Sequence, residues 1–324
     1  MRAIVVDRWM DPSELVVREV PEPLVTPGGV LIEVRAAGCN FFDTLIVQGR
    51  YQVKPRFPFI PGAEIAGVVR AVGLDVSGIA VGDRVLAAGS TGAFAERAVA
   101  DASVVHVLPD SMSFEAGAAL PVIYPTSYAG LVYRGDLRAG ETLLVHAAAG
   151  GVGVAAVQIG RAIGARVIAT AGGREKCEIA LREGADAAID YRSEDFVERV
   201  LELTSGRGAD VIYDSVGGDI TDQSLKCIAW NGRLVIIGFA GGTIPAIQAN
   251  RILLKNIAVT GLHWGAHLEK DPSRVADCFR ALFQLHARGQ IAPVIYRRYK
   301  LDEVPIALAA LANRETHGKL IIEP

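Results

Sequence analysis

The sequence predicts an α/β protein in which a doubly wound parallel sheet is combined with a second, β-rich domain. A glycine-rich turn joins a short apolar strand to an amphipathic helix within residues 142–163, and strands alternate with helices from there onward. Residues 1–120 instead carry strand-like apolar runs separated by proline and glycine. A length of 324 residues suits about two domains, and a hydrophobic content of 51% supplies ample material for their cores.

Strand-like runs dominate the region before residue 120. Proline and glycine punctuate it at 21–29, 58–62 and 78–83, and 41–48 is the best local candidate for a short helix. The runs that predict strands are 3–6, 30–35, 65–72, 84–87 and 104–107. This pattern predicts an irregular β-rich domain, and a helix at 126–133 then leads out of it.

Strands and helices alternate in the rest of the chain. The expected strands are 142–146, 165–170, 186–190, 209–214, 233–238 and 257–261, and the expected helices are 152–163, 175–183, 194–203 and 219–229. This alternation predicts a doubly wound parallel sheet. A helix at 273–288, a strand at 294–297, a helix at 304–313 and a strand at 319–322 follow. We expect this last segment to return to the N-terminal domain, so that 1–122 and 264–324 form one domain and 123–263 the other.

The turn at 147–153 is typical of a site for the pyrophosphate of a dinucleotide. Gly150 allows the backbone to approach the phosphates, and Gly153 allows the following helix to pack closely on the strand. The helix N-terminus offers free N–H groups and the positive end of its dipole to the anion. Because both flanking strands and the helix fall where this mechanism needs them, the glycine pattern predicts a nucleotide site.

The residues after the second strand of this unit favour NADP(H) over NAD(H). A site for NAD usually places an Asp or Glu about 20 residues beyond the glycines, on the ribose 2′-hydroxyl. Here 170–176 reads TAGGREK, in which two glycines leave room for a 2′-phosphate and Arg174 and Lys176 supply cations. Alternatively, these cations belong to a solvated helix start, where Glu175 complements the helix dipole.

Composition and charge exclude several classes of protein. A net charge of −3 and a pI near 6.1 leave no electrostatic footprint for nucleic acid or an anionic membrane. No apolar run approaches the ~20 residues of a membrane span, and no signal peptide precedes the first strand. The four cysteines form no CxxC pair, which argues against structural zinc and suits a reducing cytosol. We therefore expect a cytoplasmic protein that associates with no membrane and has no nucleic acid as its main partner.

Several segments together resemble the quinone oxidoreductase (zeta-crystallin-like) branch of the zinc-free medium-chain dehydrogenase/reductase superfamily. They are GCNFFDTLIVQGRY (38–51), PFIPGAEIAGVVRAVG (58–73), VGDRV (81–85), AAAGGVG (147–153), GADVIYDSVGG (208–218), GRLVIIG (232–238), LLKNIAVTGLHWG (253–265) and HGKLIIEP (317–324). The resemblance covers essentially the whole chain. It implies a Rossmann domain with a doubly wound parallel sheet and a β-rich GroES-like catalytic domain.

The assignment to this branch depends on missing metal ligands. Zinc alcohol dehydrogenases of the superfamily hold a catalytic metal with Cys and His in the loops that match 38–43 and 61–64. The second loop here reads PGAE, with Ala63 where the zinc branch places His. Cys39 and Glu64 alone would make a poor zinc site, so we expect no metal. Without a Lewis acid, alcohol oxidation is disfavoured, and hydride delivery to an already electrophilic, conjugated acceptor is favoured.

The resemblance implies that NADPH gives hydride to a quinone or to the β-carbon of an activated alkene. The protein then has to place the nicotinamide against a flat apolar pocket that carries hydrogen-bond donors. Asn40 and Tyr51 match active-site positions of the family and are the predicted catalytic residues. Asp43 is a weaker candidate, because it could equally be a helix-surface acid. His263 is tempting as a proton donor, but the family does not require one.

The resemblance also implies the residues that bind the cofactor. Asn40 and Thr126 match contacts on the nicotinamide side, and Lys319 matches a C-terminal position near the cofactor. Ser215, Gly238, Phe239 and Ala240 follow later strands, where ligands of open α/β sheets bind. The positions carried over for the pyrophosphate and the adenosine end are Gly150, Gly151, Val152, Gly172, Lys176 and Tyr191.

Three functions remain open at this point. The leading interpretation is an NADPH:quinone reductase, and the second is an NADPH-dependent reductase of activated C=C bonds, such as those of an enone or an acrylyl-type substrate. The third is a non-enzymatic NADPH-binding protein with a structural or RNA-binding role, against which the charge balance argues. Members of the family are usually homodimers or homotetramers, and the sixth strand with 241–250 is a plausible edge for subunit pairing.

Overall fold

The computed structural model describes residues 1–89 and 91–324 and divides them into two compact units. One unit contains Met1–Val122 and Pro293–Pro324, and the other contains Ile123–Ala292. The sequence pattern places residues 264–292 with the first domain, whereas in the structure they belong to the second unit. The reason is that helix α10 (Pro272–Ala287) packs on α3 (Ile123–Tyr128).

The second unit is built around a six-stranded sheet in which every neighbouring pair of strands is parallel, as the sequence predicts. The order is β10-β9-β8-β11-β12-β13. The strands are β8 (Thr142–Val145), β9 (Arg166–Ala171), β10 (Ala187–Asp190), β11 (Ala209–Asp214), β12 (Ile228–Ile236) and β13 (Ala258–Gly261). The strand order reverses between β8 and β11, and the carboxyl ends at such a reversal are where open α/β sheets bind ligands.

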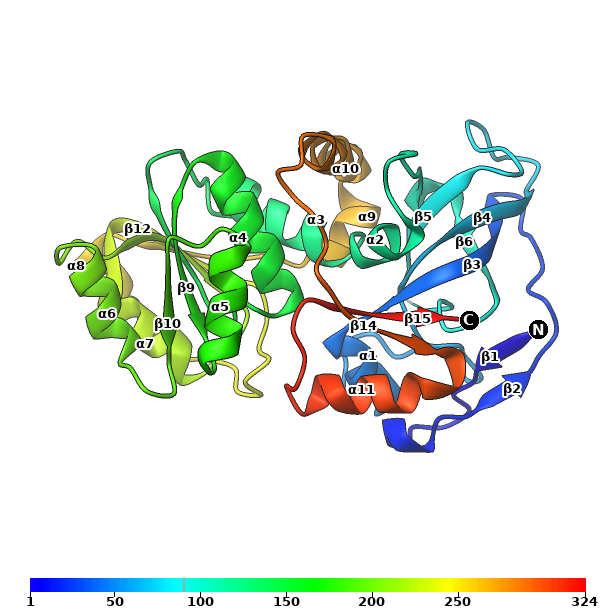
Figure 1. The fold of residues 1–324 in the computed structure, drawn as a ribbon, viewed down its shortest axis with the longest axis horizontal. Helices are drawn as coiled ribbons and strands as arrows, with labels where there is room; N and C mark the ends of the chain where they lie inside the picture. The colour runs from blue at the N-terminus through cyan, green and yellow to red at the C-terminus, as the bar shows by residue number, and fades with distance from the viewer. Residues whose placement is uncertain (90) are drawn as a thin grey trace. The chain divides into compact units, whose positions relative to one another are not determined.

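Helices cover both faces of this sheet (Figure 1). They are α4 (Gly151–Ile163), α5 (Arg174–Arg182), α6 (Phe196–Leu203) and α7 (Asp219–Cys227). Since a parallel sheet is buried on both faces, its strands read as continuous apolar runs, and all of β8 is buried. Leu144, Ile168, Ile212 and Leu234 from four neighbouring strands form the centre of the core.

Capping residues explain where several helices begin. Asp195 accepts hydrogen bonds from the backbone N–H groups of Val197 and Glu198 and so caps α6. Asp271 caps α10, whose first residue is Pro272. The sequence pattern does not indicate α8 (Ala249–Lys255) or α9 (His267–Lys270). The helix expected at 126–133 begins earlier, as α3, and continues into a π-helical turn at Ala129–Arg134.

The first unit contains a seven-stranded sheet with the order β14-β15-β3-β4-β5-β7, in which β6 also pairs with β3. Its strands are β3 (Gly29–Cys39), β4 (Glu64–Val72), β5 (Arg84–Ala88), β6 (Arg97–Asp101), β7 (Val105–Val107), β14 (Ile295–Lys300) and β15 (Lys319–Glu323). Strand β15 pairs antiparallel with β3. The expected return of the C-terminal segment to the N-terminal domain is therefore confirmed.

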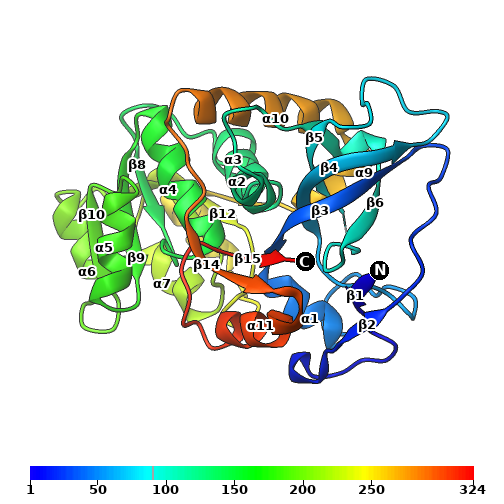
Figure 2. The same ribbon diagram turned by 45° about the vertical axis from the view of Figure 1, so that its right-hand side comes forward.

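Short elements complete the first unit (Figure 2). Strands β1 (Arg2–Ile4) and β2 (Val17–Glu19) form a small separate sheet. The helices are α1 (Phe41–Val47), α2 (Phe114–Ala119) and α11 (Val304–Ala312), with single 3-10 turns at Pro12–Glu14, Ala102–Val104 and Leu301–Glu303. Ile4, Ile32, Val85, Phe94 and Ile322 belong to one buried core. Among the residues described, no helix combines the length and apolar character needed to cross a bilayer.

Candidate active site

The N-terminus of α4 lies at the carboxyl end of β8, beside the point where the strand order reverses. Its N-cap, Gly150, supplies no side-chain acceptor, and the first N–H groups of a helix have no acceptor within the helix. A Cβ atom on Gly153 would lie 2.2 Å from the carbonyl oxygen of Ala147 and 2.7 Å from the Cα of Ala148. Gly153 therefore packs closely on the backbone of the turn that follows β8, and Gly151 and Val152 fall in the half-buried first turn of a helix whose N-terminus suits an anion.

Tyr191 lies over Gly172 at the ends of β9 and β10. A Cβ atom on Gly172 would lie 2.5 Å from the Tyr191 hydroxyl oxygen, so any larger residue here would have to displace this ring. Gly173 has a φ of 97° and caps α5, and its N–H donates to Asp190 Oδ1 at 2.8 Å. These backbone bonds hold the pKa of Asp190 below its usual value, so this carboxylate is ionised and already engaged.

Arg192 is a cation beside these glycines that no sequence pattern singles out. Its Nε and Nη1 atoms lie 3.2 and 3.4 Å from the Cβ positions of Gly172 and Gly173, respectively. Arg174, by contrast, is paired with Glu178 one turn along α5, and its side chain is 92% exposed. Lys176 lies half-buried in the first turn of the same helix. The signal that could have revealed Arg192 is its place directly after the third strand of the sheet.

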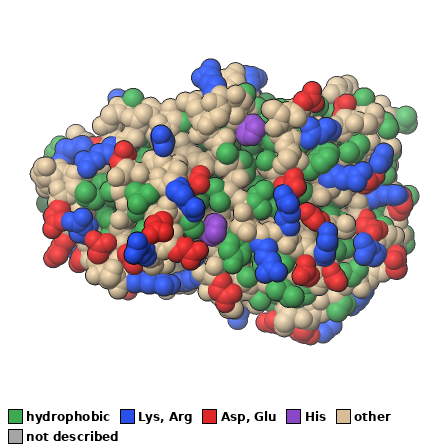
Figure 3. All heavy atoms as spheres, viewed as in Figure 1, with side chains coloured by type: hydrophobic (Ala, Val, Ile, Leu, Met, Phe, Trp, Pro, Cys, Tyr) green, Lys and Arg blue, Asp and Glu red, His purple; other side chains and the backbone are tan. Residues whose placement is uncertain are grey.

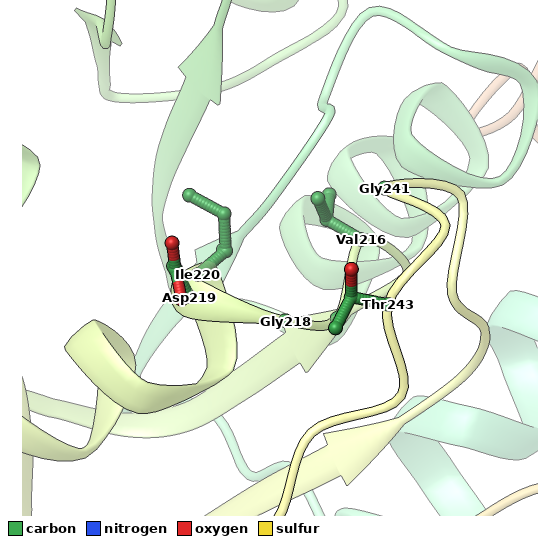
Figure 4. A pocket seen from close by; sticks show the side chains of 7 residues that line it. Val216, Gly218, Asp219, Ile220, Gly241 and Thr243 are labelled. Carbon is green, nitrogen blue, oxygen red and sulfur yellow. The ribbon is translucent and has the colours of Figure 1, made fainter.

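The loops after β11 and β12 are joined by backbone hydrogen bonds. Ala240 N donates to Ser215 O at 3.1 Å, and Gly241 N donates to Val216 O at 2.8 Å. Phe239 is exposed, and Gly238 follows the end of β12. Beside them is a pocket of about 220 Å³ that Val216, Gly218 and Thr243 help to line (Figure 4). Ser215, Gly238, Phe239 and Ala240 are thus brought together at the carboxyl edge of the sheet.

Helix α3 contacts the first turn of α4. Ser127 Oγ donates to the carbonyl oxygen of Val152 at 2.8 Å, and its neighbour Thr126 is half-buried. The hydroxyl of Tyr124 is directed elsewhere, because it donates to Gln158 Oε1 at 2.7 Å inside the unit. Ser127 is therefore the residue of α3 that is hydrogen-bonded to the first turn of α4, and Thr126 precedes it in the chain.

His146 lies directly after β8 and is fully buried under the nucleotide turn. Its Nδ1 and Nε2 atoms lie 3.0 and 2.8 Å from the hydroxyl oxygens of Thr170 and Ser224. Burial lowers the pKa of His146 to about 4, against a smaller opposing effect of Asp214. The imidazole is therefore neutral at pH 7 and ties β8 to β9 and α7.

A buried ion pair lies at the centre of the first unit. Lys319, at the start of β15, pairs with Glu64, at the start of β4, and both side chains are almost fully buried. The Lys319 ammonium also donates to the carbonyl oxygen of Cys39 at 2.6 Å and to Asn40 Oδ1 at 2.8 Å. Its three N–H groups are thus all engaged, a role for Lys319 that sequence reasoning missed.

The same pair fixes the side chain of Asn40. Its Oδ1 accepts from Lys319, and its Nδ2 donates to Glu64 Oε1 at 2.7 Å. The second carboxylate oxygen of Glu64 accepts from Val122 N at 2.9 Å. Because each end of the amide faces a partner of the opposite kind, the Asn40 side chain has a single favourable orientation.

Asp43 caps α1 and lies beside the buried cluster that Asn40, Glu64 and Lys319 form. Its Oδ2 accepts from Asn40 N at 2.7 Å, whereas its Oδ1 is buried and has no hydrogen-bond partner among the described residues. Burial raises the pKa of Asp43 to about 7, while the Asn40 backbone and Lys319 oppose the rise. Asp43 is therefore not the helix-surface acid that the sequence allowed.

Tyr51 lies close to this cluster. Its ring stacks on Phe42, with the ring centroids 5.4 Å apart. Burial raises the pKa of Tyr51, and the charge of Asp43 adds to the effect. Asn40, Asp43 and Tyr51 thus come together in the first unit, within a segment that is contiguous in the sequence.

Cys39 and Glu64, which lie in the loops that match the zinc-binding loops of the superfamily, have other roles in this structure. Both oxygens of Glu64 accept hydrogen bonds, and burial raises the pKa of the Cys39 thiol well above its usual value, which disfavours the thiolate that binds metal. Over the described part of the chain, no group of three His, Cys, Asp or Glu side chains is arranged to hold a metal ion.

Residues 26–110 match the family described as alcohol dehydrogenase GroES-like domain, and residues 151–282 match the family described as zinc-binding dehydrogenase. Quinone oxidoreductase-like protein 2 from Bos taurus is 38% identical over 95% of this chain and 88% of that protein. Human quinone oxidoreductase is 33% identical over 99% of this chain and 97% of that protein.

A solved structure extends this similarity to three dimensions. The quinone oxidoreductase of Escherichia coli, complexed with NADPH, superposes with a TM-score of 0.93 at 33% identity and covers 100% of both chains. A score of this size over the full length of both chains shows that the two proteins share one fold. The chain therefore belongs to the quinone oxidoreductase branch of the medium-chain dehydrogenase/reductase superfamily.

Proposed function

We propose that this protein is an NADPH-dependent oxidoreductase that passes a hydride to a quinone without zinc. One observation carries the cofactor assignment: close backbone packing at Gly153 sets the N-terminus of α4 at the carboxyl end of β8, and Arg192 lies beside Gly172 and Gly173 just beyond β9. The helix N-terminus suits a pyrophosphate, and the Arg192 guanidinium suits a 2′-phosphate. The similarity to a quinone oxidoreductase complexed with NADPH supports the same assignment.

Each part of the cofactor has candidate residues in the second unit. When bound, NADPH would supply a hydride to the acceptor. Gly150, Gly151 and Val152 would hold its pyrophosphate, and Gly172, Lys176, Tyr191 and Arg192 the 2′-phosphate and adenosine. On the nicotinamide side, the candidates are Thr126, Ser215, Gly238, Phe239 and Ala240.

In the first unit, Asn40 and Tyr51 would orient the reacting groups. The fixed amide of Asn40 offers a hydrogen bond of one defined direction, and the Tyr51 ring, already stacked on Phe42, offers an aromatic face and a hydroxyl. Lys319 would act through Asn40, because its own N–H groups are engaged. A conjugated acceptor needs such placement more than it needs a Lewis acid.

The direct test is NADPH oxidation by the metal-free protein with 1,4-benzoquinone, phenanthrenequinone and an α,β-unsaturated ketone, with NADH as the parallel donor. We expect fast turnover of the quinones with NADPH and little with NADH. Equal rates with NADH would refute the 2′-phosphate assignment, and silence with every acceptor would refute the enzymatic function and leave a non-enzymatic NADPH-binding role.

Reduction of an activated C=C bond is the second candidate. Hydride addition to an enone leaves an enolate that needs a proton, and Asp43 and Tyr51 are two acids of raised pKa in the same cluster. Turnover of the ketone alone in the same assay would favour this function.

A further inference from the structure

We propose that Asp43 holds the proton that the reduced acceptor takes up, and that it releases this proton through the hydroxyl of Tyr51. The inference rests on the proposed function, because it names the proton source of that reaction. Asp43 would not touch the acceptor itself and would act through Tyr51.

The charges of the cluster favour a protonated Asp43. Glu64 and Lys319 neutralise each other, and the Lys319 ammonium gives its N–H groups to Glu64, the Cys39 carbonyl and Asn40. None of these three N–H groups donates to Asp43, whose side chain is fully buried. An ionised Asp43 would therefore leave one uncompensated negative charge in a buried site, which is costly, whereas a neutral carboxyl leaves the cluster balanced.

The hydrogen bonds place that proton on one oxygen. Asp43 Oδ2 accepts from the backbone N–H of Asn40, so a proton there would oppose an existing donor. Oδ1 has no partner in the described structure and is free to carry the proton. The carboxyl therefore keeps its capping bond through Oδ2 while Oδ1–H remains available for transfer.

The groups around Asp43 leave Tyr51 as the outlet. The titratable groups facing it are the Cys39 thiol of β3, Glu64 of β4, Lys319 of β15 and Tyr51, while α11, which packs on α1, has no titratable side chain. Glu64 and Lys319 are bonded to each other. The Tyr51 ring stacks on Phe42, the residue before Asp43, and the Asp43 charge raises the pKa of Tyr51. Because no direct hydrogen bond joins the two side chains, the proposed path requires one bridging water.

A quinone that has gained a hydride is a hydroquinone monoanion, and its oxygen takes the proton of the Tyr51 hydroxyl. The Tyr51 oxygen is reprotonated from Asp43 Oδ1 through the water, which leaves a carboxylate that recovers its proton from solvent. The net reaction consumes one NADPH, one quinone and one proton and yields NADP⁺ and hydroquinone.

The test compares Asp43→Asn with Tyr51→Phe and a control, Asp101→Asn. Asp43→Asn keeps an oxygen for the Asn40 N–H but cannot release a proton, and Tyr51→Phe keeps the ring on Phe42 but removes the hydroxyl. Asp101 is an exposed capping carboxylate that accepts from Ser103 N at 2.9 Å, so its variant controls for loss of a cap. For each, kcat with 1,4-benzoquinone and saturating NADPH is measured in H₂O and D₂O from about pH 5 to about pH 9.

We expect the wild-type kcat to fall above about pH 7 and to show a solvent isotope effect. Asp43→Asn and Tyr51→Phe should each lose both features and about 10- to 100-fold in kcat, and Asp101→Asn should match the wild type. If Asp43→Asn kept the wild-type pH profile and rate, the proton relay from Asp43 through Tyr51 would be overturned and the proposed function would stand. No turnover by the wild type with any acceptor would refute the proposed function and the relay together. If Asp43→Asn does not fold, Tyr51→Phe decides: an unchanged isotope effect overturns the relay.

A second readout needs no turnover. Difference infrared spectroscopy of the wild type should show a protonated-carboxyl band that disappears between about pH 6 and about pH 8 and is absent from Asp43→Asn. Absence of this band from the wild type would overturn the proposal even if quinones are reduced.

Discussion

At the residue scale, Lys319 and Glu64 form a buried ion pair, and removal of either charge alone should destabilise the protein. Lys319→Met or Glu64→Gln leaves one buried charge unpaired, so we expect each to lower the free energy of unfolding by about 3–5 kcal/mol. The double variant removes both charges and should recover most of this loss. Urea unfolding measures the stabilities, and removal of the exposed pair Asp277–Arg280 provides a control expected to cost about 0–1 kcal/mol.

The same variants separate folding from function. In the double variant, the Asn40 amide loses the two charged partners that fix its orientation. We therefore expect kcat/KM with a quinone to stay low although stability returns. A double variant as unstable as either single one would contradict the buried-pair explanation.

Asp43 makes stability depend on pH. Its pKa in the folded protein is about 7, above the ordinary 3.8, so between these values the folded state holds a proton that the unfolded state releases. The folded state is thus favoured most below about pH 4, and this advantage is lost as the pH rises to about 7. Between these pH values, the Tm of Asp43→Asn should therefore fall less than the Tm of the wild type, which calorimetric scans measure. Curves of Tm against pH that run parallel for the two proteins would contradict the raised pKa.

Arg192 should discriminate between the two nicotinamide cofactors. If its guanidinium meets the 2′-phosphate, Arg192→Gln should weaken NADPH binding about tenfold and leave NADH binding unchanged, because only NADPH carries that group. Nucleotide fluorescence titration measures both affinities. Arg174→Gln is the control, since Arg174 is already paired with Glu178 on an exposed helix surface. Equal losses for both cofactors in Arg192→Gln would place the side chain elsewhere.

At the element scale, the start of α4 depends on one glycine. A methyl group at position 153 would overlap the backbone of Ala147 and Ala148, which cannot give way as a flexible side chain can. We expect Gly153→Ala to cost about 1–3 kcal/mol or more and to abolish NADPH binding by displacing the helix N-terminus. Gly28→Ala is the control, because nothing lies within 4 Å of its Cβ position. Chemical denaturation and cofactor titration test both variants, and normal binding by Gly153→Ala would contradict the close approach.

The elements that sequence predicts best are those whose signal is local. The strand β8, the turn and α4 are contiguous, so spacing alone locates the nucleotide turn. The bond between Lys319 and Glu64 joins residues 255 apart in sequence, and no local pattern reports it. Likewise, the apolar stripe of α10 predicts a helix but does not say against which unit it packs, so the domain boundary at 264 was misplaced.

At the scale of the whole molecule, charged side chains of one sign form no dominant patch on the face seen in Figure 3, where acidic and basic side chains are interspersed. This distribution agrees with a net charge of −3 and offers no continuous basic stripe on that face for a nucleic acid. Two other surface features favour association between copies of the chain: an unpaired sheet edge and exposed apolar side chains.

The edge of the second unit's sheet has both of these features. Strand β13 pairs with β12 on one side and is the last strand in the sheet, and no strand among the described residues pairs with its other edge. In the neighbouring α8, Leu253 and Leu254 are 76% and 68% exposed, and Ile244 before it is 73% exposed. Burial of such side chains between two copies would remove apolar surface from water and cover the edge. We therefore propose a homodimer formed through this region.

The dimer is tested by placing charge on α8. Leu253→Glu with Leu254→Glu should convert the dimer to a monomer without lowering the stability of the folded unit, because both side chains already lie outside the core. Light scattering after size-exclusion chromatography measures the mass. Leu74→Glu, at a side chain that is 98% exposed in the other unit, is the matched control and should remain dimeric. A dimer that survives the double substitution would exclude α8 from the interface, and a monomeric wild type would exclude the dimer itself.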